Sequence, residues 1–175
     1  DITINYDEKI VDHDKGEVLS DTGQLFRSWE KQYGWIDTDN TKVVYGMVGK
    51  QDEIKLNDLT IKAETEFATI AISTLTKDPI NNSQNLLLTA VGLADNAGSK
   101  YNEDETALLD SGTGPIECEV IKARISIRTN RKDLKVWSVD DEGFLTGTIP
   151  SSYENGVFSF GIGNEFESIY YLIQN

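Results

Sequence analysis

Apolar and polar residues alternate along most of this chain, and the alternation has a period of two. Because successive side chains of a β-strand point to opposite faces, this period predicts strands rather than amphipathic helices. The segments concerned are rich in Val, Ile, Thr and aromatic residues, and polar turn residues separate them. They are residues 67–75, 85–93, 123–129, 133–139, 156–162 and 168–174.

Shorter segments continue the pattern. GQLFRSWE and GWIDTD predict a hairpin around Lys31-Gln32-Tyr33, and DEIKL and DLTIKAE predict two short strands joined near Asn57-Asp58. The segments EGFLTGTIP and SSYENGVFSFGI together predict another hairpin, for which Asn155-Gly156 is a strong turn signal.

Two segments interrupt the alternation. NTKVVYGMVG (40–49) is β-branched and contains Gly46 and Gly49, so we expect an irregular strand or a short turn there. A single helical turn capped by Thr38 or Asn40 is the alternative. Residues 94–115 are polar and predict a long loop or excursion, a feature that is often functional or mobile in compact domains.

The fold class follows from this succession of elements. Short strands at regular spacing, without a long helix, predict an all-β protein built as an antiparallel β-sandwich, jelly-roll-like. A closed barrel is the lesser alternative. The 175 residues suit a single module spanning 1–175, large enough to bury its own core.

Charge narrows the choice of partner. The chain has 30 acidic and 16 basic residues and a formal net charge of −14. This balance argues against nucleic acid and against anionic membranes, which both attract clustered Lys and Arg. No apolar run reaches the length of a membrane span. We therefore expect an extracellular protein with a neutral partner; its start at Asp1 suggests a processed chain or an excised module.

The residues of catalytic chemistry are sparse. His13 is the only histidine and no Gly-x-Ser-x-Gly motif is present, so the sequence does not support a Ser-His-Asp site. Cys118 is alone, which excludes an internal disulfide, and one His with one Cys cannot form a usual zinc site. Thirty acids guarantee many carboxylate pairs, so a pair alone is weak evidence for a glycosidase. We expect no enzyme activity.

Calcium is the cation that the sequence could accommodate. It takes six to eight oxygen ligands, and DNAGSKYNEDE supplies Asp95, Asn102 and Asp104 as candidate ligands. The acids of DTDN (37–40) are a second choice. Neither stretch has EF-hand spacing, and an acidic, solvated loop is the alternative interpretation.

Aromatic residues gather in GQLFRSWEKQYGWIDTD (23–39). Sugars stack their C–H faces on flat rings, while neighbouring polar side chains bind the hydroxyls. Trp29, Tyr33 and Trp35, with Arg27 and Asp37, are the candidate ligand-binding residues, and we call these five the predicted sugar platform.

The alternation leaves two orientations open for this stretch. If Leu25 points to the core, so does Trp29. If Phe26 and Ile36 point inward, Trp29 and Trp35 lie on the outer face together with Arg27 and Asp37, and this is the orientation that we favour. We expect Tyr33 to be exposed because it lies near the turn. We expect Trp137, which lies in another predicted strand, to be less exposed than Trp29, Tyr33 and Trp35.

Six segments share the pattern of one known kind of domain: LKVWSVD (134–140), GTIP (147–150), GVFSF (156–160), YYLI (170–173), residues 20–49 and residues 85–98. They resemble the C-terminal β-sandwich found in many multidomain bacterial glycoside hydrolases. Two positions depart from the pattern: Leu93 stands where arginine is expected, and Asp39-Asn40 where a proline is usual.

The resemblance implies an accessory module of a secreted bacterial enzyme. We expect a non-catalytic carbohydrate-binding module whose partners are a plant-type polysaccharide or oligosaccharide and the catalytic domain of the same polypeptide. The alternative is a structural domain that braces the catalytic domain without binding sugar, and it predicts an exposed apolar patch. A small glycoside hydrolase or lyase and an adhesin are further alternatives.

Overall fold

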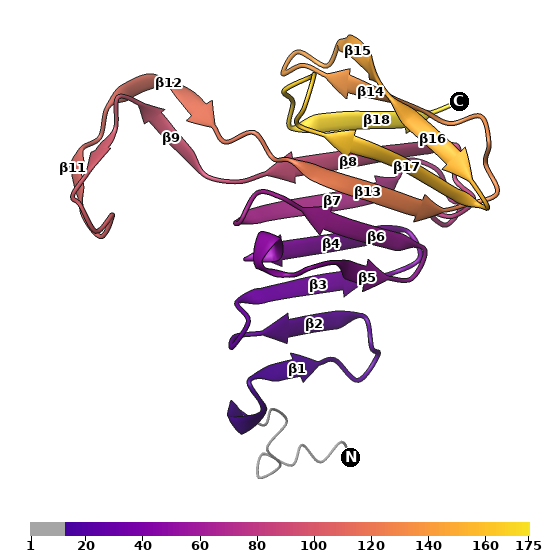
Figure 1. Ribbon diagram of the computed structural model, residues 1–175, viewed down its shortest axis with the longest axis horizontal. Coiled ribbons are helices and arrows are strands. Elements are labelled where there is room, and N and C mark those ends of the chain that lie inside the picture. Colours follow the sequence, from indigo (N-terminus) through magenta and orange to yellow (C-terminus); the bar gives the residue numbers. More distant parts are fainter. Residues whose placement is uncertain (1–12) are drawn as a thin grey trace, which may run out of the picture.

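Two antiparallel sheets face each other in the computed structural model, which describes residues 13–175 (Figure 1). One sheet has nine strands and the other has five, and neither closes into a barrel. The predicted all-β, antiparallel sandwich is therefore confirmed.

The nine-stranded sheet contains most of the N-terminal half of the chain and its last strand. In order across the sheet, its strands are β1 (Glu17–Leu19), β2 (Leu25–Ser28), β3 (Tyr33–Asp37), β4 (Thr41–Gly46), β7 (Ala68–Thr74), β8 (Asn85–Val91), β18 (Tyr170–Gln174), β14 (Lys135–Val139) and β15 (Leu145–Ile149). The last strand, β18, thus lies near the middle of the sheet, between β8 and β14.

The five-stranded sheet covers part of this surface. Its strands, in order, are β16 (Ser151–Glu154), β17 (Val157–Ile162), β13 (Ala123–Arg128), β6 (Leu59–Ala63) and β5 (Ile54–Leu56). Two single 3₁₀ turns complete the body, η1 (His13–Lys15) and η2 (Val48–Lys50). Neither helix of the described chain is long and apolar enough to span a membrane.

The core lies between the two sheets because each inner strand buries every second side chain. In β7, for example, Ala68, Ile70 and Ile72 are buried while their neighbours are more exposed. Ile70 lies in register with Val44 on one side and Ala90 on the other. The predicted period of two therefore corresponds to the real inner face.

Residues 41–46 form a regular strand in the interior of the sheet, so the expected irregular strand or short turn at 40–49 was wrong for most of that segment. Pairing with β3 on one side and β7 on the other stabilises β4, and its β-branched residues suit such a position. Gly46, at φ +93°, ends the strand, and the single turn of η2 follows.

The Asn155-Gly156 turn is confirmed, and it joins β16 to β17. Both residues have positive φ, as a tight hairpin turn requires. The preceding segment does not pair with this hairpin as we expected. Instead β15 pairs with β14 in the nine-stranded sheet, and the chain crosses between the sheets at Pro150.

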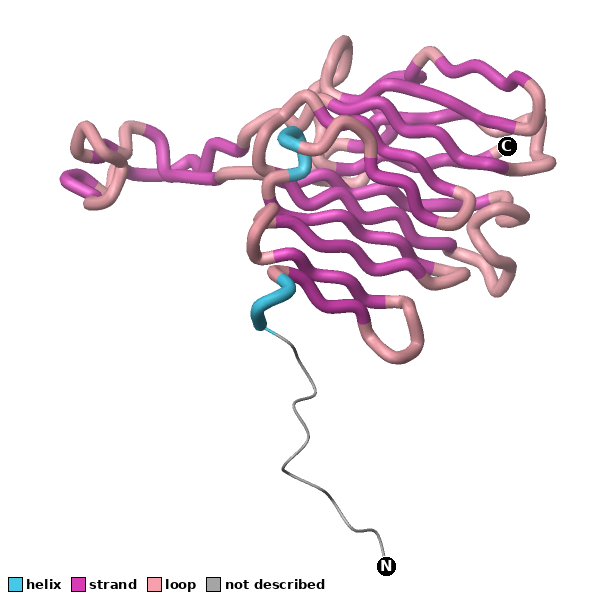
Figure 2. Tube along the Cα trace, turned by 60° about the horizontal axis from the view of Figure 1, so that its bottom comes forward, coloured by secondary structure: helices cyan, strands magenta, loops and turns pink. Residues whose placement is uncertain are grey.

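Residues 94–118 project from the body as an arm (Figures 1 and 2). The arm consists of two-stranded ribbons made by β9 (Ala94–Ala97), β10 (Lys100–Tyr101), β11 (Leu108–Asp110) and β12 (Thr113–Cys118). At its base the N–H of Glu119 donates to the carbonyl of Leu93 at 2.8 Å. The predicted excursion is confirmed, and it has regular structure.

Candidate functional site

Tyr33 and Trp35 lie on the core side of the nine-stranded sheet. Trp35 is in register with Phe26 on one side and with the buried Val44 on the other, so these side chains share a face. The rings of Phe26 and Trp35 stack with centroids 5.3 Å apart, and Phe26 lies 5.6 Å from Tyr33. Our favoured orientation, which placed Trp35 on the outer face, was therefore wrong.

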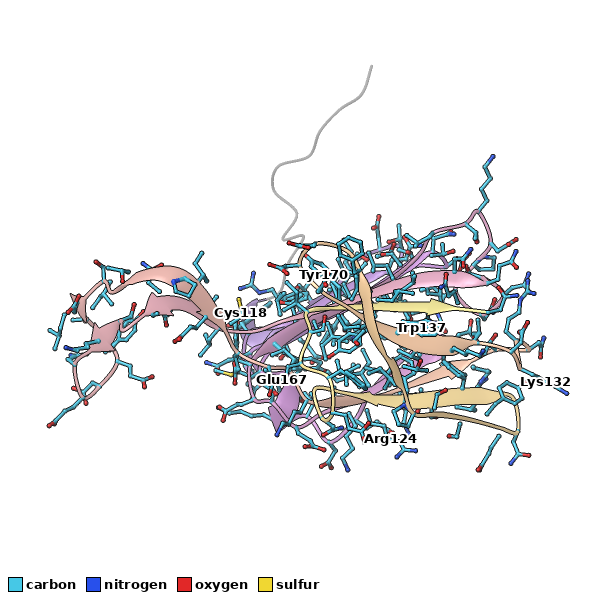
Figure 3. All side chains as sticks on the ribbon, turned by 90° about the horizontal axis from the view of Figure 1, so that it is seen from above. Cys118, Arg124, Lys132, Trp137, Glu167 and Tyr170 are labelled. Carbon is cyan, nitrogen blue, oxygen red and sulfur yellow. The ribbon has the colours of Figure 1, made fainter. Side chains whose placement is uncertain are left out.

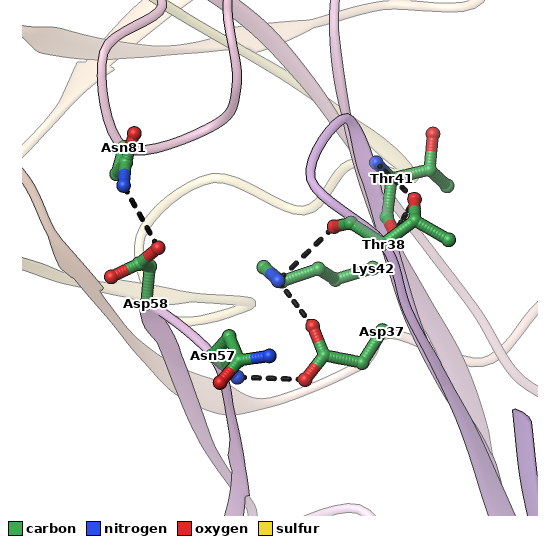
Figure 4. A network of polar contacts seen from close by, with 7 residues as sticks. All are labelled: Asp37, Thr38, Thr41, Lys42, Asn57, Asp58 and Asn81. Carbon is green, nitrogen blue, oxygen red and sulfur yellow. Dashed lines mark hydrogen bonds and ion pairs between the residues drawn. The ribbon is translucent and has the colours of Figure 1, made fainter. Parts of the chain in front are cut away.

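Asp37 is also inside, where it forms an ion pair with Lys42 (Figure 4). The lysine is 2% exposed, and its ammonium also donates to the carbonyl of Thr38 at 3.1 Å. The other carboxylate oxygen of Asp37 accepts the N–H of Asn57 at 2.8 Å. This network ties β3 and β4 to the β5–β6 turn, and it corrects the expected outer position of Asp37.

Three members of the predicted sugar platform come together at one end of the sheet. Arg27, Trp29 and Tyr33 line a pocket of about 330 Å³. The remaining lining residues are Ser28, Gln32, Tyr45, Gly46, Met47 and Phe67. We call this the end pocket. It combines aromatic rings with a guanidinium and an amide.

The β2–β3 turn positions Trp29 and Gln32 at the end pocket. The carbonyl of Gly16 accepts the N–H of Trp29 at 3.0 Å and the hydroxyl of Ser28 at 3.2 Å. Gln32 has φ +57°, a left-handed conformation that is costly for a residue with a side chain. Its carbonyl accepts the N–H of Met47, which fixes the turn against the end of β4.

A glycine makes room for Tyr45 in the end pocket. Gly34 lies between Arg27 and Tyr45 in one cross-strand row on the outer face. A Cβ atom at Gly34 would collide with the Tyr45 ring, so this ring lies across the glycine backbone. The row therefore places a flat ring next to the Arg27 strand, an arrangement that suits stacking against a planar or sugar-like ligand.

The sequence did not reveal Gln32, Tyr45 or Phe67 as lining residues. Tyr45 lies in the segment that we did not expect to be regular, and Phe67 directly precedes a core strand. The combination of Gly34 with a tyrosine in the next strand was a usable signal, because aromatic residues often cover a glycine in a neighbouring strand. It could be used only once the β3–β4 register was known.

The candidate calcium ligands lie on the arm and make other contacts. Asp95 accepts a hydrogen bond of 2.7 Å from the hydroxyl of Tyr101, which raises the pKa of Tyr101. The side-chain oxygen of Asn102 accepts the N–H groups of Thr106 and Ala107. Asp104 is exposed. Within residues 13–175 no three His, Cys, Asp or Glu side chains are grouped to hold a metal ion, so calcium stays a prediction.

The outer face of the nine-stranded sheet is apolar along a row that crosses eight strands. In register from β2 to β15, the row reads Leu25, Ile36, Val43, Ala71, Thr89, Tyr170, Val139 and Leu145. A second row reads Thr41, Ser73, Leu87, Leu172, Trp137 and Thr148. We call these two rows and their flanking strand positions the outer face.

The solvent-facing side of the five-stranded sheet is polar, unlike the outer face. Its strands place polar side chains outward, such as Arg124, Ser126 and Lys62. Tyr170, on the outer face, and Arg124, on the five-stranded sheet, lie on opposite sides of the sandwich (Figure 3). A sheet face in contact with water is usually polar, so the nine-stranded sheet departs from the expected pattern.

No protein-family model matches this sequence, and no curated protein or solved structure matches it significantly.

Proposed function

We propose that this chain is a non-catalytic module that binds a carbohydrate in the end pocket. Trp29 and Tyr45 would provide the faces for stacking, and the side chains of Arg27 and Gln32 would bind hydroxyl groups. A neutral polysaccharide or oligosaccharide suits a protein with a net charge of −14, because it brings no charge repulsion. An extracellular role beside a catalytic domain belongs to the same proposal.

The observation that supports it is the composition of the end pocket. Ligand sites are usually concave, largely apolar and aromatic, with a few polar groups that fix orientation. The end pocket has this combination, and three residues that the sequence had marked as ligand-binding meet there: Arg27, Trp29 and Tyr33.

Affinity electrophoresis tests the proposal. The chain would be run through native gels that contain xylan, β-glucan, xyloglucan, mannan or pectin, with and without EDTA. We expect retardation in at least one gel, and Trp29→Ala should abolish it because the stacking surface is lost. An effect of EDTA on the retardation would support the calcium prediction.

Phe144→Ala is the matched control for Trp29→Ala. Phe144 is an aromatic residue with 65% exposure in the β14–β15 turn, which does not line the end pocket. Its removal should leave retardation unchanged. Equal retardation of both variants in every active gel would contradict a role for the end pocket.

A second candidate function is the structural module that braces a catalytic domain without binding sugar. The apolar outer face favours it, because such a domain needs a surface that another domain can cover. Absence of retardation in every gel would favour this second candidate over the carbohydrate-binding module.

A further inference from the structure

The arm exposes apolar side chains that its own structure cannot cover. None of residues 94–118 is buried, yet Leu108, Leu109 and Ile116 are 52%, 71% and 69% exposed. An isolated two-stranded ribbon is marginally stable in water. Hydrogen bonds such as those from Asn96 and Ser99 to the carbonyl of Ser111 hold the ribbon in shape. The arm is therefore an ordered segment with uncovered apolar groups.

The arm is also strongly acidic. It has one lysine, Lys100, against six acidic residues. The acids are Asp95, Glu103, Asp104, Glu105, Asp110 and Glu117. A surface that receives the arm should therefore be apolar and should lack acidic side chains of its own.

The outer face meets both requirements. At none of its strand positions within residues 13–175 does an Asp or Glu occur, although the chain has 30 acids. Its charged positions are Arg27 and Lys135. Apolar side chains along it are partly exposed, including Leu25 at 51% and Tyr170 at 37%. The outer face is thus complementary to the arm in charge and in polarity.

The length of the arm also fits within the length of the apolar row on the outer face. At a rise of about 3.3 Å per residue, the stretch from β9 to β10 is roughly 25 Å long. Eight strands spaced by about 4.8 Å make the apolar row roughly 34 Å long. The row is therefore long enough to accommodate this stretch of the arm.

We propose that the arm of one copy docks on the outer face of a second copy of this chain. Because each copy has one arm and one outer face, the two contacts can be exchanged across a two-fold axis in a closed dimer. Two exchanged contacts would cover both uncovered apolar surfaces at once. This proposal does not depend on sugar binding, although Arg27 belongs both to the outer face and to the lining of the end pocket.

Sedimentation velocity and light scattering on the whole chain test the dimer. We expect a dimer at micromolar concentration, and an arm-less variant in which an Asn-Gly turn replaces residues 94–118 should be a monomer. The hydrogen bond between Leu93 and Glu119 brings the two cut ends together, so we expect this variant to keep its sandwich. A monomeric whole chain, or an arm-less dimer, would overturn the proposal.

A pair of charge variants tests which surface receives the arm. Thr89 is in the middle of the apolar row, between Ala71 and Tyr170. Thr89→Glu should weaken the dimer at least ~10-fold because it places a negative charge beneath an acidic arm, whereas Thr89→Lys should leave it as tight or tighter. Equal weakening by both variants would overturn docking of the arm on this face.

Leu25→Glu and Leu25→Lys provide the same comparison at a position that cannot disturb the core. Leu25 is at the end of the row and is 51% exposed. If a Thr89 variant fails to fold, as judged by circular dichroism, the Leu25 pair decides the question. We expect Leu25→Glu to weaken the dimer more than Leu25→Lys does. The difference should be smaller than at Thr89 because Leu25 lies at the end of the row.

Discussion

Lys42 has the burial of a core residue and the charge of a surface residue. Its alkyl chain lies on the inner face, in register with Ile72, and its ammonium reaches Asp37 and the carbonyl of Thr38. A buried ion pair often contributes little compared with an apolar pair of similar volume, but removal of one partner leaves an uncompensated charge. The pair therefore makes the junction between β3, β4 and the β5–β6 turn sensitive to single substitutions.

Lys42→Ala should lower the free energy of unfolding by about 3–5 kcal/mol, because Asp37 stays buried without its partner. The double variant Lys42→Met with Asp37→Asn should recover most of this loss, since the amide can still accept the N–H of Asn57. Urea unfolding of the two variants measures the difference. If the double variant were as unstable as the single one, the unpaired charge of Asp37 would not account for the loss.

Because Tyr171 is buried, we expect the protein to lose stability at alkaline pH. Burial raises the pKa of its hydroxyl above the ordinary value of 10.0, against the smaller opposite effects of hydrogen bonds with Gly163 and Ser168. Because the folded pKa is higher than the unfolded one, this contribution is fully present below pH 10.0 and is lost as the pH rises through the folded pKa.

Urea unfolding at pH values on both sides of 10.0 should show this decline, and Tyr171→Phe should make it shallower. The variant also loses hydrogen bonds to the N–H of Gly163 and the carbonyl of Phe166, so it should be about 1–2 kcal/mol less stable at neutral pH. An unchanged alkaline slope in the variant would assign the decline to other tyrosines.

At the scale of elements, alternation and turn chemistry predicted the strands well. The segments at 67–75, 85–93 and 156–162 became β7, β8 and β17, and Asn155-Gly156 formed its turn. The β2–β3 hairpin was also expected, but its orientation was not decidable. Apolar side chains occupy both faces there, because Leu25 and Ile36 lie outside while Phe26 and Trp35 lie inside. The period of two cannot identify the inner face of such a strand.

Gln32→Gly should separate the conformational cost of the β2–β3 turn from its function. Gln32 has φ +57°, so glycine should raise the free energy of unfolding by up to about 1 kcal/mol. The variant also removes an amide from the end pocket, so retardation in a glycan gel should decrease. Higher stability with undiminished retardation would show that the side chain does not contact the ligand.

The arm and the sandwich should be energetically separate elements. Because no side chain of residues 94–118 is buried, the arm-less variant should unfold within about 1 kcal/mol of the whole chain under conditions where both are monomers. Urea unfolding in dilute solution measures this. A larger loss would mean that the arm supports the body through contacts at its base, around Leu93 and Glu119.

At the scale of the whole molecule, composition and period together predicted an antiparallel sandwich, and the candidate site was only partly predictable. Arg27, Trp29 and Tyr33 meet in the end pocket, while Trp35 and Asp37 face the core. Whether a predicted residue lies in the end pocket or in the core depends on strand register and on the order of strands. Both depend on contacts between segments far apart in the sequence. The apolar outer face was hidden for the same reason, since its rows combine residues from eight strands.

The position of β18 has a consequence for the synthesis of this protein. The strand pairs with β8 and β14, so without it the nine-stranded sheet is divided into a group of six strands and a separate β14–β15 hairpin. During translation, β8 and β14 therefore keep free edges until residues 170–174 have left the ribosome. Free strand edges are templates for aggregation. We expect ribosome-bound chains that stop before residue 170 to be sensitive to protease and to recruit chaperones, and chains that include β18 to be resistant.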